Sequence, residues 1–259
     1  MNLHRSRIAG ITLGIAVALV ASSASAQGTV APARAELSAL DQPIAWMTDA
    51  KRNYSAVKDY TCVLVSQERV RGKLEVENVI EFKMRPEPFS VAMRWLTPKK
   101  TQGQQVIYVQ GKNNNRMRVK STFFGANVVG FVSVDINDPR VMQHSRHTIV
   151  EAGIGNMIDT ALRHWEIERR LAKTDVKIAE YKFDNRPCYR IELTRAEKRS
   201  DVHSHRTIMF LEKESKIPIH VENYEHPREG GPPGGDLLEI YSYTSLRFNV
   251  GLKDAEFDK

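Results

Sequence analysis

The sequence predicts a mainly β protein (α+β), in which one curved antiparallel sheet forms a half-barrel and helices pack on its concave face. Three observations predict this fold. Most segments between residues 59 and 250 alternate apolar and polar residues, which is the period of a half-buried strand. Turn residues separate many of these segments, as in sequential antiparallel hairpins. Two amphipathic helical stretches interrupt the strands and can cover the apolar face of a sheet wide enough to curl.

The composition is that of a folded globular chain. The 259 residues are 41% hydrophobic and 27% charged, so the chain can bury enough apolar surface to fold. Two cysteines exclude a disulfide-dense scaffold and a four-cysteine zinc site. The net charge of +7 is spread along the chain without a basic block, so charge alone gives no argument for nucleic-acid binding.

The first 26 residues have the pattern of a secretory signal peptide. Basic residues precede the apolar run Ile8–Ala21, whose 14 residues are fewer than the ~20 that cross a bilayer. The small residues Ala24 and Ala26 then predict cleavage after Ala26, with a retained anchor as the alternative. We therefore expect a periplasmic or secreted protein with a flexible leader at 27–38 and a single half-barrel domain at 39–259.

The first helix is expected from Pro43 onward. Apolar residues recur there at three- and four-residue steps up to Tyr54, and Asp41 or Gln42 can cap the helix. A period of two then begins at Asp59. The expected strands of this half are Tyr60–Val70, Leu74–Met84, Phe89–Trp95, Gln104–Gln110 and Arg116–Ser121.

A looser stretch, 123–146, precedes the second helix. Asn156 is the expected cap of that helix, whose apolar stripe includes Ile158, Ala161 and Trp165 and which is expected to end near Lys173. The remaining strands are expected at Val176–Phe183, Cys188–Thr194, Thr207–Glu212, Ile217–Tyr224 and Leu237–Val250.

No motif indicates a catalytic, cofactor or metal site. The sequence lacks the G-x-S-x-G elbow, H-E-x-x-H, phosphate-binding loops and Cys-x-x-Cys. The pairs His144/His147 and His203/His205 have no assured third ligand, so we predict that they bind no metal. We expect no catalytic residues and no cofactor.

The two cysteines, Cys62 and Cys188, lie in expected strands. An even number of cysteines in an oxidising compartment favours one disulfide between them. The alternative is two separate buried thiols.

One apolar strand face contains large and partly flexible side chains. A curved sheet covered by helices tends to leave a concave apolar space, where small ligands bind. The alternative is that this face is ordinary core. The expected ligand-binding residues are Ile80, Phe82, Met84, Val91, Met93 and Trp95.

Several short motifs follow one another along the chain, among them Tyr60-Thr61-Cys62, Gln67-Glu68-Arg69-Val70, Tyr108-Val109, Leu237-Leu238-Glu239 and Asn249-Val250-Gly251-Leu252. Together they resemble DUF1571, a family of bacterial envelope proteins without a settled function. The order of helices and strands is similar to that of the periplasmic lipoprotein carriers of the LolA/LolB type. The resemblance implies an open half-barrel with helices over a lipid-binding cavity, although a shared fold does not fix function.

These observations predict a secreted or periplasmic binding protein for a hydrophobic envelope ligand, such as a lipid or a lipoprotein acyl chain. We expect it to act as a carrier or sensor of this ligand and to have no enzymatic activity. Its expected further partners are the membrane surface, through peripheral contact, and an envelope protein. One alternative is a hydrolase of envelope polymers that uses carboxylates near Glu222–Glu239. The other is a structural protein that binds a partner at a sheet edge.

Overall fold

A computed structural model describes residues 38–121, 130–171, 173–199, 202 and 204–258. The predicted signal peptide, and the predicted leader except Ser38, lie outside these residues. None of the described helices is long and apolar enough to span a membrane.

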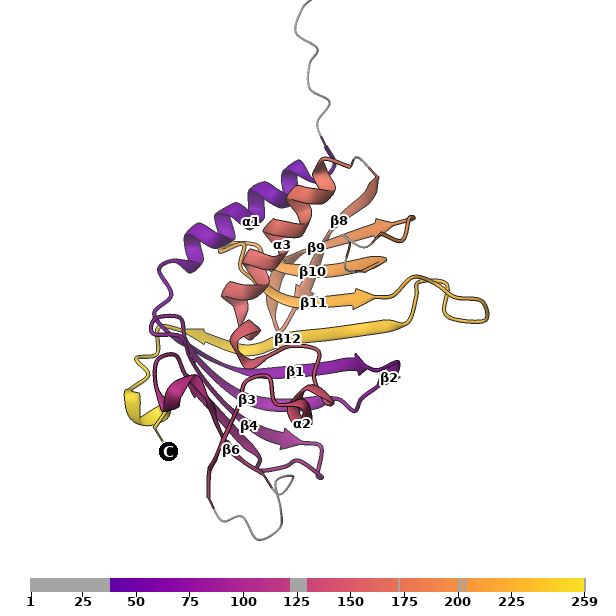
Figure 1. The fold of residues 1–259 in the computed structure, drawn as a ribbon. Helices are drawn as coiled ribbons and strands as arrows, with labels where there is room; N and C mark the ends of the chain where they lie inside the picture. Colours follow the sequence, from indigo (N-terminus) through magenta and orange to yellow (C-terminus); the bar gives the residue numbers. More distant parts are fainter. Residues whose placement is uncertain (1–37, 122–129, 172, 200–201, 203, 259) are drawn as a thin grey trace, which may run out of the picture. The chain divides into compact units, whose positions relative to one another are not determined.

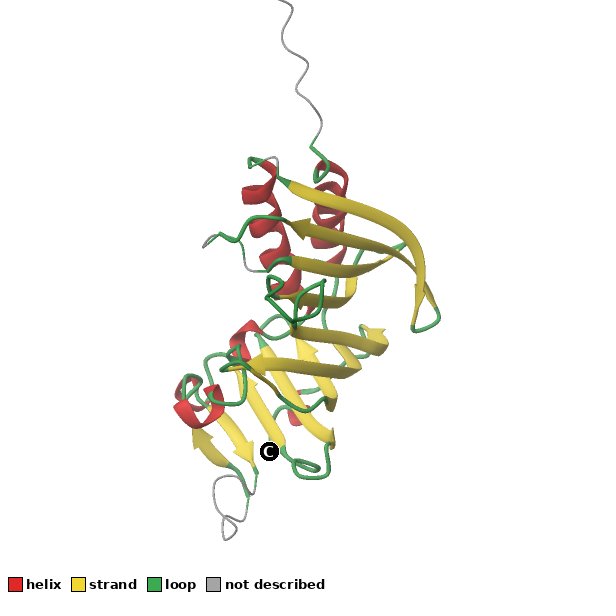
Figure 2. Cartoon of the chain, turned by 90° about the vertical axis from the view of Figure 1, so that its right-hand side faces the viewer, coloured by secondary structure: helices red, strands yellow, loops and turns green. Residues whose placement is uncertain are grey.

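The described strands form one antiparallel sheet whose two edges, β7 and β8, do not pair with each other (Figures 1 and 2). The order across the sheet is β7-β6-β5-β4-β3-β1-β12-β11-β10-β9-β8, and β2 pairs with β1. The first seven strands are β1 (Tyr60–Val70), β2 (Lys73–Leu74), β3 (Asn78–Arg85), β4 (Ser90–Thr97), β5 (Gln105–Val109), β6 (Met117–Lys120) and β7 (Val132–Val134). The last five are β8 (Thr174–Phe183), β9 (Arg186–Arg195), β10 (Arg206–Glu212), β11 (Pro218–Tyr224) and β12 (Leu237–Phe248). The predicted mainly β class and open antiparallel sheet are confirmed.

Helices cover the concave face of the sheet. They are α1 (Asp41–Tyr54), α2 (Pro139–Met142) and α3 (Ile154–Arg169), with short 3₁₀ turns at η1 (Asn113–Asn115), η3 (Ile149–Glu151) and η4 (Asp254–Glu256). Figure 1 shows α1 and α3 side by side, and their apolar stripes are buried against the sheet. Two ion pairs join the helices, Lys51–Asp159 at 2.8 Å and Arg169–Asp41 at 2.7 Å.

The start of α3 differs from the prediction. The helix begins at Ile154, whose backbone N–H donates to the buried Tyr60 hydroxyl at 3.0 Å. Gly153 precedes it with φ +99°, and a Cβ there would approach the Met84 side chain and the Tyr60 hydroxyl to 3.0 Å. Asn156 lies inside the first turn and donates to two preceding carbonyls, so it is not the N-cap. The last helical residue is Arg169, four positions before the expected end.

Two strand predictions also need correction. The expected strand Leu74–Met84 is broken at residues 75–77. Val76 in this break is 60% exposed and is not buried on the apolar face of the sheet as the alternation predicts. The stretch expected to be loose contains β7 and α2, and Asp138 caps α2 by accepting from the Arg140 N–H.

The predicted disulfide is wrong. Cys62 and Cys188 are free, buried thiols. Cys62 lies in β1 and Cys188 in β9, and three strands stand between them. At ~4.8 Å per strand step the path across the sheet from β1 to β9 is about 19 Å, whereas the Cα atoms of a disulfide lie within about 7 Å of each other. Burial raises the pKa of both thiols above its ordinary value, which keeps them protonated.

Candidate functional site

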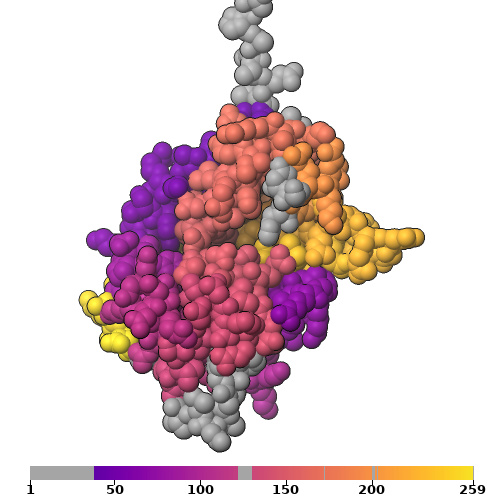
Figure 3. All heavy atoms as spheres, viewed as in Figure 1, coloured from indigo at the N-terminus to yellow at the C-terminus, as the bar shows by residue number. Residues whose placement is uncertain are grey.

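A cavity of about 1210 Å³ lies between the concave face of the sheet and the segments that cover it. Its cover consists of α3 and of residues 139–152, which we call the strap. The strap contains α2 and η3 and connects β7 to α3. Figure 3 shows α3 and the strap together on this face of the molecule.

The floor of the cavity is apolar. Its side chains come from strands of both halves of the sheet: Leu64, Ile80, Met93, Trp95, Val106, Met117, Val119, Met209, Val221 and Tyr243. Met157, Ala161 and Trp165 of α3 face them from the cover. An apolar space of this size is larger than the ~300–1,000 Å³ usual for small-molecule pockets, and it suits a long ligand.

The six predicted ligand-binding residues divide into two groups. Ile80, Met93 and Trp95 line the cavity, and the Trp95 indole N–H donates to Asn78 at 3.0 Å. The other three do not line it and are fully packed core residues, namely Phe82, Met84 and Val91. Met84 and Val91 are paired on β3 and β4 close to Gly153, and Phe82 packs between the rings of Tyr60 and Tyr243. Which residues touch a ligand stays a prediction.

A polar row crosses the sheet at one end of the cavity. It consists of Thr207, Asn223, Glu239 and Glu68, which stand opposite one another in register on β10, β11, β12 and β1. Directly paired residues lie on the same face of a sheet, and all four line the cavity. The Thr207 hydroxyl donates to Asn223 Oδ1 at 2.9 Å, and Asn223 Nδ2 donates to Glu239 Oε1 at 2.8 Å.

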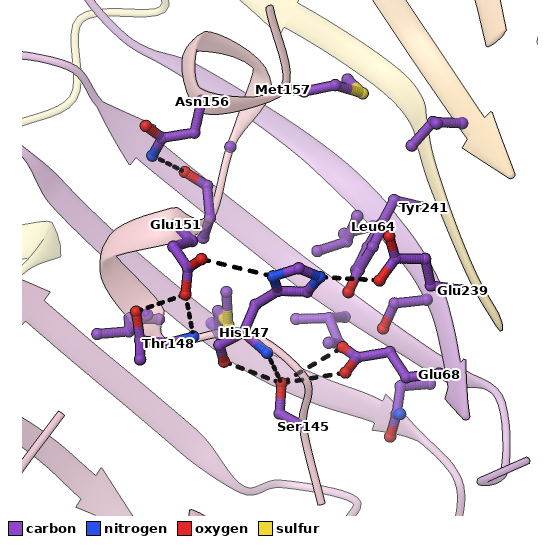
Figure 4. A pocket seen from close by; sticks show the side chains of 18 of the residues that line it. Leu64, Glu68, Ser145, His147, Thr148, Glu151, Asn156, Met157, Glu239 and Tyr241 are labelled. Carbon is purple, nitrogen blue, oxygen red and sulfur yellow. Dashed lines mark hydrogen bonds and ion pairs between the residues drawn. The ribbon is translucent and has the colours of Figure 1, made fainter. Parts of the chain in front are cut away.

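The strap is bound to the two carboxylates of the polar row. The Ser145 Oγ lies 3.2 and 3.4 Å from the two oxygens of Glu68 and 3.0 Å from the His147 carbonyl, and the Arg146 N–H donates to Glu68 Oε2. Glu239 Oε2 lies 2.8 Å from His147 Nε2 (Figure 4). The same oxygen lies 3.1 Å from Arg146 Nε. Like charges directly opposite on neighbouring strands repel, so these strap contacts also stabilise the Glu68–Glu239 pair.

The neighbouring carboxylates change the titration of His147. Burial lowers the pKa of its imidazole, but the hydrogen bond and charge of Glu239, with the charges of Glu68 and Glu151, outweigh burial and raise the pKa to about 9. His147 therefore carries a positive charge at neutral pH. Glu151 Oε1 lies 3.6 Å from His147 Nδ1, and its other oxygen accepts from the Thr148 N–H and hydroxyl at the start of η3.

A buried ion pair extends the polar row toward α3. Arg195 of β9 donates from Nε and Nη2 to the two oxygens of Glu168, at 2.7 and 2.9 Å. Its Nη1 donates to Thr207 at 3.0 Å and to Ser204. Glu168 and Arg195 are 3% and 5% exposed, so the pair is almost entirely removed from water. Together these groups form one hydrogen-bonded chain from α3 to the strap.

Glu222 and Glu239, which bound the stretch suggested for a hydrolase, lie on opposite faces of the sheet. Glu239 pairs with Asn223 on the cavity face, whereas Glu222 pairs with Ile240 and therefore lies on the other face. Glu222 accepts from the Tyr224 hydroxyl and contacts His220 outside the cavity. One substrate cannot contact Glu222 and Glu239 together.

The histidine pairs have other partners. His147 contacts carboxylates, while His205 Nδ1 contacts the Arg195 carbonyl at 2.6 Å. His203 lies outside the described residues. Over the described ranges, no group of three or more His, Cys, Asp and Glu side chains is arranged to hold a metal ion.

The sequence analysis missed the polar row, although a signal was present. On β12, Glu239 occupies the same alternating position as the cavity-facing Tyr241 and Tyr243. On α3, Glu168 follows Ala161 and Trp165 on the apolar stripe. A polar residue at an apolar position of a strand or helix is the pattern that could have identified the site.

Comparison with known proteins gives a family and a set of fold neighbours. No curated protein sequence matches the chain. An uncharacterized conserved protein from Thermus thermophilus has 7% identity and a TM-score of 0.47, and the match covers 84% of this chain and 93% of that one. The lipoprotein LppX of Mycobacterium tuberculosis has 9% identity and a TM-score of 0.46, with 82% and 98% covered. A LolA superfamily protein from Nitrosomonas europaea has 11% identity and a TM-score of 0.34, with 86% and 98% covered. The profile of the DUF1571 family, described as a protein of unknown function, matches residues 57–259, and the chain belongs to this family.

Proposed function

We propose that this protein binds a hydrophobic envelope ligand, a lipid or an acyl chain, and acts as its carrier or sensor. The observation that supports the proposal is the cavity of about 1210 Å³ with its apolar floor. Each methylene that moves from water into such a space contributes about 0.8 kcal/mol, so a chain of a dozen carbons can be held without any specific polar contact.

The cover explains how a ligand enters. Residues 145–147 of the strap contact the sheet through polar groups at the end of the apolar floor, whereas Ile149 of the strap and the apolar stripe of α3 pack in the core. Displacement of residues 145–147 exchanges hydrogen bonds and ion pairs with the protein for contacts with water. This exchange costs less than opening an apolar core. The strap is therefore the gate of the proposed ligand path.

Intrinsic fluorescence tests the proposal directly. Trp95 and Trp165 line the cavity, whereas Trp46 stacks on Tyr189 at 4.2 Å and does not line it. Titration with dodecanol should shift the tryptophan emission saturably and displace the fluorescent probe 1-N-phenylnaphthylamine. The shift should persist in Trp46→Phe and shrink in Trp95→Phe. No saturable binding of either compound to the folded protein would refute the proposal.

The proposed location is the periplasm or the exterior. It depends on residues 1–26, whose sequence predicts export and cleavage. Amino-terminal sequencing of the protein from the cell envelope fraction should begin at or near Gln27. A soluble protein that still begins with Met1 would contradict the proposed location.

A further inference from the structure

β8 is the longer of the two open edges of the sheet. It has ten residues, Thr174–Phe183, whereas β7 at the opposite edge has three. β8 pairs with β9 along its whole length without a bulge, and no described strand pairs with its outer side (Figure 1). It also contains no proline. A regular edge of this kind presents a row of backbone N–H and C=O groups to which another strand can pair.

The side chains in the second half of β8 are open to the solvent. Residues 177–182 are all exposed, and Tyr181 among them is 49% exposed. The Tyr181 ring nevertheless has a fixed place, because it packs against Phe210 with the ring centroids 4.7 Å apart. The first half of the strand is more covered, since the Thr174 hydroxyl donates to Glu168 of α3. A partner strand therefore has free access to the second half of β8.

The charges on β8 suit pairing with a second copy of the same strand. Lysines on an edge strand normally oppose pairing, because like charges meet when two edges come together. On β8, however, each lysine stands two positions after an acidic residue, as in Asp175 with Lys177 and Glu180 with Lys182. Residues two apart point to the same face of a strand. In an antiparallel pair related by a twofold axis through the residue between them, each acidic residue stands opposite the lysine of the other copy.

The second of these pairs gives the more favourable register. The first would place the twofold axis at Val176, in the covered half of the strand. The second places the axis at Tyr181, in the exposed half, so that the two Tyr181 rings stand opposite each other and Ala179 stands opposite Phe183 of the other copy. Aromatic pairs and opposite charges that lie directly across two strands both stabilise a sheet. The register centred on Tyr181 therefore combines two ion pairs with aromatic contacts.

We propose that two copies of this chain form a symmetric dimer by antiparallel pairing of their β8 strands about Tyr181. Each Glu180 then forms an ion pair with Lys182 of the other copy. Glu180 already contacts Lys213 at 2.6 Å, but its side chain is 80% exposed and can accept from a second lysine. No residue of β8 lines the cavity, so the dimer leaves the cavity accessible and does not depend on the proposed function.

Sedimentation equilibrium of the unmodified protein and of charge-reversal variants tests the dimer and its register. The protein range should reach about 200 μM, because an interface built on one short strand belongs to the weak class. We expect the unmodified protein to dimerise reversibly within this range. Glu180→Lys and Lys182→Glu each place like charges opposite one another twice and should weaken the dimer at least about tenfold. An equimolar mixture of the two variants restores both ion pairs and should associate about as tightly as the unmodified protein.

Lys177→Glu is the matched control, because it reverses an exposed lysine on the same strand. In the proposed register Lys177 stands opposite Asn185 in the turn of the other copy, so this variant should still dimerise. A register centred on Val176 would instead lose the dimer in Lys177→Glu.

Four results would overturn the proposal. They are a monomer over the whole concentration range, a dimer that survives both Glu180→Lys and Lys182→Glu, a mixture of these two variants that does not associate, and a dimer that is lost in Lys177→Glu. Circular dichroism should show the same fold in every variant, since the three replaced side chains are exposed. If Glu180→Lys does not fold, the comparison of Lys182→Glu with Lys177→Glu decides, and equal association of these two variants refutes the register.

Discussion

Phe82 of β3 and Met93 of β4 stand directly opposite each other, yet the structure gives them different roles. Phe82 is 1% exposed and packs between the rings of Tyr60 and Tyr243, with centroids 5.9 and 6.2 Å away. Met93 is only partly buried and lines the cavity. Replacing each residue should therefore separate the core from the ligand site.

The expected magnitudes differ in folding and in binding. Phe82→Ala removes a fully packed ring and should lower the free energy of unfolding by about 3–5 kcal/mol. Met93→Glu places its carboxylate at the cavity, where water can solvate it, so the loss of stability should stay below about 2 kcal/mol. An acyl chain in the cavity would desolvate that carboxylate at a cost of several kcal/mol. The affinity for dodecanol should then fall by at least about 100-fold, or about 2.7 kcal/mol.

Urea unfolding gives the stabilities, and displacement of 1-N-phenylnaphthylamine by dodecanol gives the affinities. The control Ile178→Glu also introduces a glutamate, on β8 at a position that is 41% exposed and outside the cavity. This variant should keep the stability and the dodecanol affinity of the unmodified protein. A cooperative loss of the fold in Met93→Glu would mean that Met93 is core. Unchanged dodecanol affinity in a folded Met93→Glu protein would equally refute the assignment.

Three other predictions concern the polar and thiol groups. Glu168→Gln leaves the Arg195 charge buried without its partner and should lower the free energy of unfolding in urea by about 3–5 kcal/mol. A combined Glu168→Leu and Arg195→Met variant should recover much of this loss. An unchanged free energy of unfolding in the single variant would contradict a buried ion pair. The pKa of His147 is raised to about 9 in the folded state, so the stabilisation from protonated His147 is complete below pH 6.5 and is lost as the pH rises through about 9. The pH dependence of stability in this range should disappear in His147→Asn. An NMR titration of His147 with a midpoint near 6.5 would disprove the Glu239 contact. Thiol counting in guanidinium without reductant should find both Cys62 and Cys188 free, whereas an absence of free thiols would restore the disulfide.

Local patterns in the sequence predict most of the strands and both long helices. The alternation in β12 and the three- and four-residue spacing in α1 depend only on neighbouring residues, and both elements form within two residues of the expected bounds. The predicted cap of α1 is wrong, because Leu40 is the N-cap and Asp41 and Gln42 are helical. The start of α3 could not be predicted in the same way. It depends on a hydrogen bond to Tyr60, which is 94 positions away in the chain.

The site was harder to predict than the fold because it depends on the register between distant strands. Glu68 and Glu239 are separated by most of the chain, and only the pairing of β1 with β12 places them opposite each other. The disulfide prediction failed for the same reason. The number of cysteines says nothing about the three strands that stand between Cys62 and Cys188.

The most direct test of the central claim is to ask what the cavity holds in the cell. The protein should be purified from the envelope fraction of its own organism without detergent, extracted with organic solvent, and the extract analysed by mass spectrometry. We expect the unmodified protein to yield an amphiphile in near-stoichiometric amount, and Met93→Glu purified in parallel to yield none. An extract with no amphiphile, together with no binding of added dodecanol by the folded protein, would contradict the assignment of the cavity as a ligand site.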